Sequence, residues 1–236
     1  MKKLQVIAIF CLLFLTGCTI SSEKSISDQK KDSANWSKPR TKLFSSLDYP
    51  ELSKVEAEKL IREKFDLTIP SFFNQALDQT QKLVKAENQL QYAIKSEAEI
   101  LTIRGVITEK ENGSPNFFGL AEAQFQVNQQ KQHVYLTKQS ILIQNTASDN
   151  ALQGESISLF IKRLGEAMEL PDLEQVMEQA ERKIAQAKKN GPNQLIEIYN
   201  DSEQAKKQQQ LSHILTISYD ENNLVKEIYG LISSER

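Results

Sequence analysis

Residues 121–127 read Ala-Glu-Ala-Gln-Phe-Gln-Val, with an apolar residue at every second position. A period of two is typical of a β-strand, because successive side chains of a strand point to opposite faces of the sheet. The polar stretch Gln129-Gln130-Lys131 follows, and residues 133–144 are rich in valine, tyrosine, leucine, threonine and isoleucine. We therefore predict two neighbouring antiparallel strands joined by a turn at 129–131.

The same period of two extends toward the N-terminus. Apolar residues alternate at Leu90, Tyr92 and Ile94, and residues 101–107 form a second β-rich run. The stretch Asn112-Gly113-Ser114-Pro115 has the composition of a hairpin turn. The sequence thus predicts an antiparallel meander of three or four strands between about residue 90 and residue 144.

Two helices are predicted before this meander. Ser53 and Glu56 have the spacing of a capping box, and apolar residues at helical spacing follow over about 53–65. Pro70 interrupts the pattern, and a second amphipathic helix is predicted over about 71–86. The first part of the chain therefore reads helix, helix, strands.

The second part repeats this order after a polar connection at 146–154. A clear helical stripe begins at Ile157, a further helix opens at Pro171, and Gly191-Pro192 ends it. Three strands are predicted to close the chain, with a hairpin turn at 220–223 between the last two. Their expected bounds are about 194–200, 211–219 and 224–232.

The predicted class is α+β, with helical pairs packed on antiparallel β-sheet. One interpretation is a duplication, with a first α+β unit over 46–145 and a second over 146–236. In the order of its elements such a tandem layout is similar to the β-lactamase-inhibitor-protein type of fold, a likeness that transfers no activity. The other interpretation is one continuous domain whose strands form a single sheet, and the sequence does not choose between the two.

The N-terminus carries a different pattern. Lys2 and Lys3 precede the apolar run of residues 6–15, which has about half the ~20 residues that a membrane-spanning helix needs. The run ends in Leu15-Thr16-Gly17-Cys18. This stretch resembles the lipobox of bacterial lipoproteins, in which a leucine and two small residues precede a cysteine; the resemblance covers residues 1–18 only.

The resemblance implies that residues 1–17 are a signal peptide and that Cys18 carries the lipid, with acyl chains such as palmitate as the membrane anchor. Residues 18–45 are predicted to be a disordered tether, rich in serine and charge; Trp36 is expected to dock on the folded domain rather than contact the membrane. We expect an exported protein on the outer face of the cytoplasmic membrane. The long polar tether and the lack of disulfides favour a Gram-positive envelope.

Charge and cysteine content exclude several classes of function. Of 29 basic and 31 acidic residues, removal of residues 1–17 takes away two lysines only, which leaves 27 basic and 31 acidic residues and a net charge of −4. This balance argues against nucleic acid and against anionic lipid headgroups as partners. Cys11 leaves with the signal and Cys18 holds the lipid, so no thiol remains for a disulfide, a nucleophile or a metal site.

No catalytic constellation is found. His133 and His213 lie in predicted strands without metal-ligand spacing, and no nucleotide or serine-hydrolase motif occurs. Asp220 and its neighbours fit a hairpin turn better than a calcium loop. The carboxylate pairs Glu97/Glu99 and Glu109/Glu111 have the spacing of one strand face, which fits a solvated surface better than acid–base chemistry. No catalytic residue, cofactor or metal ligand is predicted.

These observations favour a non-catalytic binding or interaction protein of the bacterial envelope, with a protein, peptide or cell-wall partner at a sheet face or at a groove between the two halves. The polar segment 204–210 is expected to be a solvated loop. A solute-binding lipoprotein of a transporter and an extracytoplasmic hydrolase are the alternatives. A solute-binding lipoprotein would need two α/β lobes. A hydrolase would need His133 or His213 beside a nucleophile or carboxylates.

Overall fold

The computed structural model describes residues 36–84, 89–111, 114–145, 152 and 154–234. Residues 33–236 form one compact unit, which is the folded domain considered below. Within the described residues it contains five helices and nine strands, and all strand pairs are antiparallel. The predicted α+β class with antiparallel sheet is confirmed. The predicted signal peptide and the lipid site Cys18 lie outside the described residues.

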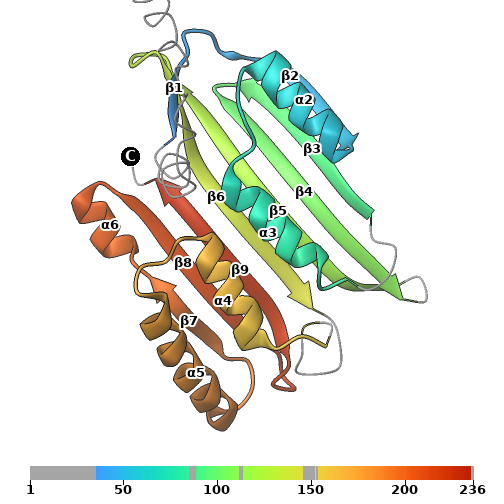
Figure 1. Cartoon of the computed structure of the whole chain (residues 1–236), viewed down its shortest axis with the longest axis vertical. Helices are drawn as coiled ribbons and strands as arrows, with labels where there is room; N and C mark the ends of the chain where they lie inside the picture. Colours follow the sequence, from blue (N-terminus) through green and yellow to red (C-terminus); the bar gives the residue numbers. More distant parts are fainter. Residues whose placement is uncertain (1–35, 85–88, 112–113, 146–151, 153, 235–236) are drawn as a thin grey trace, which may run out of the picture. The chain divides into compact units, whose positions relative to one another are not determined.

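The strands form one continuous sheet in the order β2-β3-β4-β5-β6-β9-β8-β7, while the short strand β1 pairs with β6 (Figure 1). Strands β4 and β5, β5 and β6, and β8 and β9 pair as neighbours, with turns at 129–132 and 220–224 as the patterns predict. The predicted turn residues 112–113 lie outside the described residues. The strands are β1 (Ser37–Pro39), β2 (Phe44–Leu52), β3 (Gln89–Ala98), β4 (Ile100–Glu111), β5 (Ser114–Asn128), β6 (His133–Asn145), β7 (Leu195–Asn200), β8 (Leu211–Tyr219) and β9 (Val225–Ser234).

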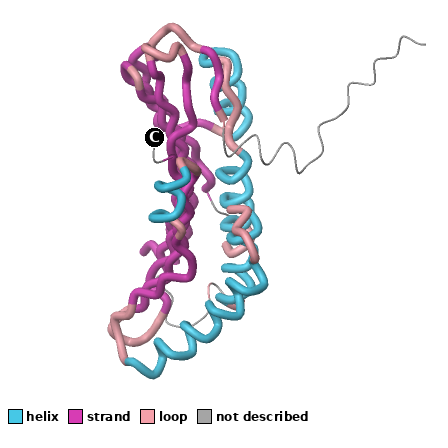
Figure 2. The backbone as a smooth tube through the Cα atoms, turned by 90° about the vertical axis from the view of Figure 1, so that its left-hand side faces the viewer, coloured by secondary structure: helices cyan, strands magenta, loops and turns pink. Residues whose placement is uncertain are grey.

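The helices α2–α5 lie along one face of this sheet (Figure 2). The two pairs follow each other along the face, and α3 and α4 contact one another. The short helix α6 packs beside β8 at one end of the sheet. The helices are α2 (Lys54–Phe65), α3 (Ser71–Gln81), α4 (Ile157–Ala167), α5 (Leu173–Asn190) and α6 (Ser202–Gln208).

The core lies between α2–α5 and the sheet. The four apolar residues of the 121–127 run are all buried, as their period of two predicts. Gly105 in β4 gives α3 room to approach, because a Cβ built there would lie 2.3 Å from Leu77 Cδ1 and 3.2 Å from Phe73 Cζ. The alternating strands and the helical stripes therefore meet in one hydrophobic layer.

The strands of the two parts of the chain meet at β6 and β9. Ser140 pairs with Leu231 and Leu142 pairs with Tyr229, so the last three strands extend the sheet begun by the meander. This arrangement is the single sheet that was one of the two interpretations of the sequence. In each part a helix pair precedes strands, but β1 and β2 come before α2, and α6 separates β7 from β8.

The capping box of α2 forms as predicted. Glu56 N donates to Ser53 Oγ at 3.3 Å, and Ser53 N donates to the Glu56 carboxylate at 2.8 Å. In contrast, α3 ends at Gln81 instead of residue 86. Its last turn is followed by Leu83 and Val84, which are buried after the chain leaves helical geometry. Burial of these two side chains, and not continued helix, explains their apolar character.

Three elements differ from the sequence-based expectation. Part of the tether predicted over residues 18–45 belongs to the sheet, since Ser37–Pro39 is strand β1 and Phe44 opens β2. Strand β2 is irregular: its pairing with β3 shifts register twice, and it contains Pro50, so it shows no clean period of two. Helix α6 replaces the expected loop at 204–210, with Ala205 as its one buried residue.

Trp36 packs on the folded domain, as expected. Its backbone C=O accepts a hydrogen bond from Leu136 N at 3.3 Å, and its ring contacts Phe125. A pocket of about 330 Å³ lies beside it, bounded by the 68–71 segment, Asn74 and Leu136. The indole therefore packs against the core and forms one wall of this pocket.

Candidate functional site

None of the helices α2–α5 lies on the second face of the sheet, which we call the open face (Figure 2). Apolar side chains form a row across it: Val106 pairs with Leu120, Leu120 with Leu142, and Leu142 with Tyr229. All four residues are half-buried. Four adjacent strands thus contribute one apolar side chain each to a continuous surface, and three more half-buried apolar residues adjoin it, namely Phe118, Ile214 and Leu231.

A charged group borders this apolar row. The Glu122 carboxylate accepts hydrogen bonds from Arg104 Nε at 2.9 Å and from Lys138 Nζ at 3.2 Å. Burial alone would raise the pKa of Glu122, but the hydrogen bonds and charges of Arg104 and Lys138 outweigh it and hold this pKa below its ordinary value. The open face therefore combines an apolar centre with a fixed ionic group, which is the composition of protein interfaces.

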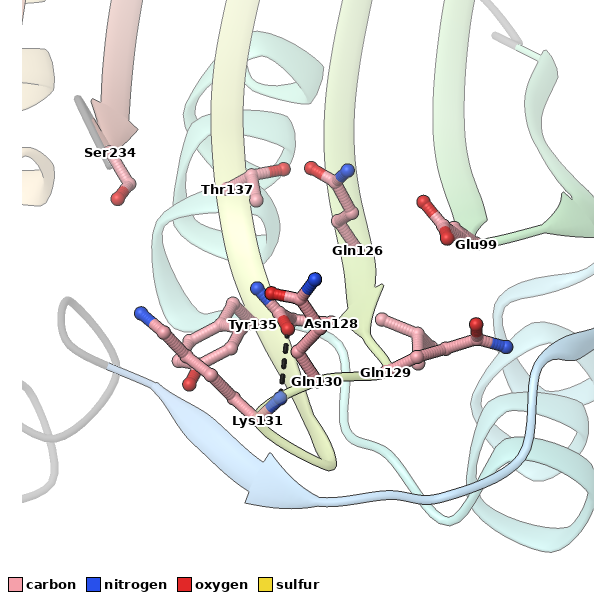
Figure 3. Close-up of a pocket in the computed structure, with 10 residues that line it drawn as sticks. Glu99, Gln126, Asn128, Gln129, Gln130, Lys131, Tyr135, Thr137 and Ser234 are labelled. Carbon is pink, nitrogen blue, oxygen red and sulfur yellow. Dashed lines mark hydrogen bonds between the residues drawn. The ribbon is translucent and has the colours of Figure 1, made fainter.

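A pocket of about 490 Å³ lies at one end of the open face (Figure 3). It is formed where the β3–β4 turn, the β5–β6 turn and the end of β9 come together. Figure 3 shows Gln126 and Thr137 on the side of the strands away from the helix behind them. The lining residues are Glu99, Gln126, Val127, Asn128, Gln129, Gln130, Lys131, Tyr135, Thr137 and Ser234.

Local backbone geometry shapes this pocket. The β5–β6 register shifts at Thr137, the extra residue of a β-bulge, and Thr137 Oγ1 donates to Gln124 O at 3.1 Å. In the preceding turn, Lys131 N donates to Asn128 Oδ1 at 2.9 Å. The bulge at Thr137 and the β5–β6 turn therefore fix the ends of β5 and β6, which together with this turn carry most of the lining side chains.

His133 lies at the margin of this pocket. Its Nδ1 is 2.7 Å from Lys131 O, and its ring stacks on Tyr135 with 6.0 Å between ring centroids. Lys131 Nζ lies 5.9 Å from the centroid of the same Tyr135 ring. These contacts give His133 a structural role in holding the tyrosine.

His213 belongs to a second cluster, at the other end of β8 from the last hairpin. Asp201 Oδ1 accepts from His213 N at 2.5 Å, and Asp201 Oδ2 lies 3.1 Å from His213 Nδ1. Tyr199 Oη donates to Asp201 Oδ2 at 3.3 Å. Burial and the nearby Asp201 carboxylate raise the pKa of Tyr199 to about 12. Asp201 thereby links the end of β7 to the start of β8.

The other acidic residues that the sequence analysis considered do not form one site. Glu97 is exposed, Glu99 lies in the β3–β4 turn at the pocket, and Glu109 is buried on the helix-covered side. Asp220 Oδ1 accepts from Asn222 N and Leu224 N at 2.8 Å each, as in a hairpin turn. Within the described ranges, no cluster of three or more histidine, cysteine or acidic residues could hold a metal ion.

Sequence reasoning placed a partner at a sheet face but did not identify the residues of the open face, although a signal for them exists. Strands covered on one face alternate, whereas Phe117-Phe118 and Ile141-Leu142-Ile143 are consecutive apolar runs, so both of their faces carry apolar side chains. The pocket had no such signal, because its residues come from three separate parts of the chain.

Within the described part of the chain, no helix has both the length and the apolar composition required to cross a bilayer. No protein-family model, curated protein or solved structure matches this chain.

Proposed function

We propose that this protein is a non-catalytic binding protein of the bacterial envelope. Residues 1–17 direct export, and lipid on Cys18 anchors the chain at the outer face of the cytoplasmic membrane. The open face of the sheet holds another envelope protein. The observation that carries this proposal is the apolar row from Val106 to Tyr229 on a sheet face that α2–α5 leave bare.

The composition of the open face supports a protein as the occupant. Half-buried apolar side chains surrounded by polar ones match the apolar core and polar rim of protein interfaces. The paired charges of Arg104, Glu122 and Lys138 beside the row add groups that can select an oriented partner. Membrane lipid fits less well, because the mature chain carries net negative charge.

The stiffness of this surface supports the same proposal. The row crosses four strands of one hydrogen-bonded sheet, backed by a hydrophobic core on its other face. Binding of a partner to this surface therefore orders few additional residues of this protein. The loss of conformational entropy on binding is correspondingly small, and more of the contact energy remains as affinity. This preformed sheet face is therefore suited to a partner with a complementary surface.

The alternative functions have weaker support. A solute receptor of the usual kind closes two α/β lobes on its ligand, whereas here one antiparallel sheet forms the domain. For a hydrolase, His213 does have a carboxylate partner in Asp201. However, the hydroxyl of the neighbouring Ser202 donates to Asn200 Oδ1 at 2.7 Å instead of facing the imidazole. The solute receptor and the hydrolase are therefore less well supported than a binding protein.

We also propose that the chain consists of two tandem units that share the sheet. In support, α2 and α3 precede four consecutive antiparallel strands, and α4 and α5 precede three. The unit boundary would lie in the 146–154 connection. Co-expression of the two fragments cut there tests this: tandem units should reassemble into a folded complex, whereas insoluble fragments would contradict the proposal.

The anchor is tested by metabolic labelling with an alkyne-bearing fatty acid in a Gram-positive host. The wild-type chain should become labelled, Cys18→Ala should lose the label, and Cys11→Ala should keep it. Cys11 is the matched control because it is the other cysteine of the chain and lies inside the predicted signal peptide. Equal labelling of the Cys18→Ala chain would overturn the assignment.

A further inference from the structure

The pocket at the end of the open face has an unusual lining. Four of its residues carry side-chain amides, two carry hydroxyls on aliphatic chains, and one is a tyrosine; Glu99 and Lys131 are its two charged residues and have opposite signs. Each amide both donates and accepts hydrogen bonds. The amides are Gln126, Asn128, Gln129 and Gln130.

This lining discriminates among ligand classes. Phosphate and other strong anions need an excess of cationic donors, and a divalent metal needs several carboxylates or imidazoles, neither of which lines the pocket. An apolar ligand would leave the amides unpaired, which costs binding energy. A neutral, hydroxyl-rich ligand satisfies amides in both directions at once. We infer that the pocket is a binding site for a neutral saccharide unit.

The contacts of individual residues agree with this inference. Asn128 Oδ1 is already used by Lys131 N, so its free amide group presents N–H donors to a ligand oxygen. Thr137 Oγ1 donates its proton to Gln124 O, so this oxygen can still accept from a sugar hydroxyl. Tyr135, held between His133 and Lys131, adds an aromatic wall with a polar end.

The size and position of the pocket also suit a saccharide ligand. About 490 Å³ falls within the ~300–1,000 Å³ typical of small-molecule sites, enough for a short segment of an oligosaccharide. The pocket opens on the same face as the apolar row, beside the β6 residues that pair with β1. The inference rests on the proposed function in one respect: an envelope-anchored protein has wall glycans within reach.

The test is isothermal titration calorimetry on the full chain, purified in a detergent without a sugar head group, such as lauryldimethylamine oxide. The probes are cellotetraose, which offers hydroxyls only, and tetra-N-acetylchitotetraose, which adds acetamido groups. We expect at least one to bind. Gln126→Ala and Tyr135→Ala should each weaken that binding by about tenfold. Preference for the acetylated probe would indicate wall glycan; preference for cellotetraose would indicate other envelope polysaccharide.

Gln186→Ala is the matched control, since this exposed amide lies on α5 beside a different surface hollow. This variant should bind the saccharide probe as tightly as the wild type does. Gln129→Ala, an exposed turn position, replaces Tyr135→Ala if the latter unfolds. Binding of neither probe at millimolar concentration, or equal binding by all variants, would overturn the saccharide site. Neither result bears on the apolar row or on the anchor, so failure here is distinguishable from failure of the proposed function.

Discussion

The indole ring of Trp36 lies edge-on to the ring of Phe125, with 5.2 Å between ring centroids and 75° between their planes. Two further side chains of the 36–40 segment bind the end of α2: Lys38 Nζ donates to Asp66 O at 2.8 Å, and Arg40 Nη1 donates to Phe65 O at 2.9 Å. The segment from Trp36 to Arg40 is therefore part of the folded domain. Their contacts reach both the sheet and the end of α2.

Replacement of Trp36 should destabilise the domain although this residue lies within the predicted tether, residues 18–45. Truncation of fully buried large aromatics costs about 3–5 kcal/mol; because Trp36 is half-buried, we expect about 1–3 kcal/mol for Trp36→Ala. Chemical denaturation followed by circular dichroism measures the change. Ser37→Ala, at an exposed neighbour, is the control. Equal stability of both variants would show that the indole does not dock.

A methyl group at position 105 should overpack the core. The added Cβ of Gly105→Ala would meet Leu77 Cδ1 at 2.3 Å, and overpacking of this kind costs about 1–3 kcal/mol. The double variant Gly105→Ala/Leu77→Ala should lose less stability than the sum of the two single variants, since the smaller side chain makes room. Strict additivity in thermal unfolding would contradict the contact between β4 and α3.

Stability should depend on pH through Glu122. Its pKa in the folded chain lies below the ordinary 4.5, so the folded state favours the carboxylate. The corresponding stabilisation is present above pH 4.5 and is lost as the pH falls through the lower folded value. Glu122→Gln should therefore be less stable at neutral pH and should lose less stability between pH 5 and pH 3. The same replacement of Glu97, an exposed residue of β3, serves as control.

Asp201 should be a structural residue. Asp201→Ala leaves His213 N–H without its side-chain acceptor, and an unsatisfied partly buried donor costs about 1–3 kcal/mol. Asp201→Asn keeps an acceptor oxygen and should recover part of this loss. Urea unfolding of the two variants checks the order. If Asp201→Ala were as stable as the wild type, the cluster of Tyr199, Asp201 and His213 would need another explanation.

The sequence predicts the elements whose patterns are regular. Period-two strands such as 121–127 and helical stripes such as that beginning at Ile157 require burial of one face, and they lie where expected. Strand β2 could not be predicted, because its register shifts and Pro50 remove the period. Helix α6 is short and buries Ala205 only, so it carries no stripe.

The two candidate sites were less predictable than the fold. The open face depends on which helices cover the sheet, and local patterns do not determine that arrangement. Only the consecutive apolar residues at 117–118 and 141–143 indicate that both faces of the sheet carry apolar side chains. The pocket joins Glu99, the 126–131 segment and Ser234, and their proximity follows from strand order alone. The absence of a catalytic constellation was an expectation from the sequence and stays one.

The proposal depends most on contact between the open face and another envelope protein. The decisive measurement places a photo-crosslinking phenylalanine analogue at Tyr229 on that face, or at the exposed Glu178 of α5 as control, in intact cells. We predict one discrete heterologous adduct from position 229, none from 178, and loss of the adduct in the Cys18→Ala chain. A homodimer adduct, or identical adducts from both positions, would contradict the account.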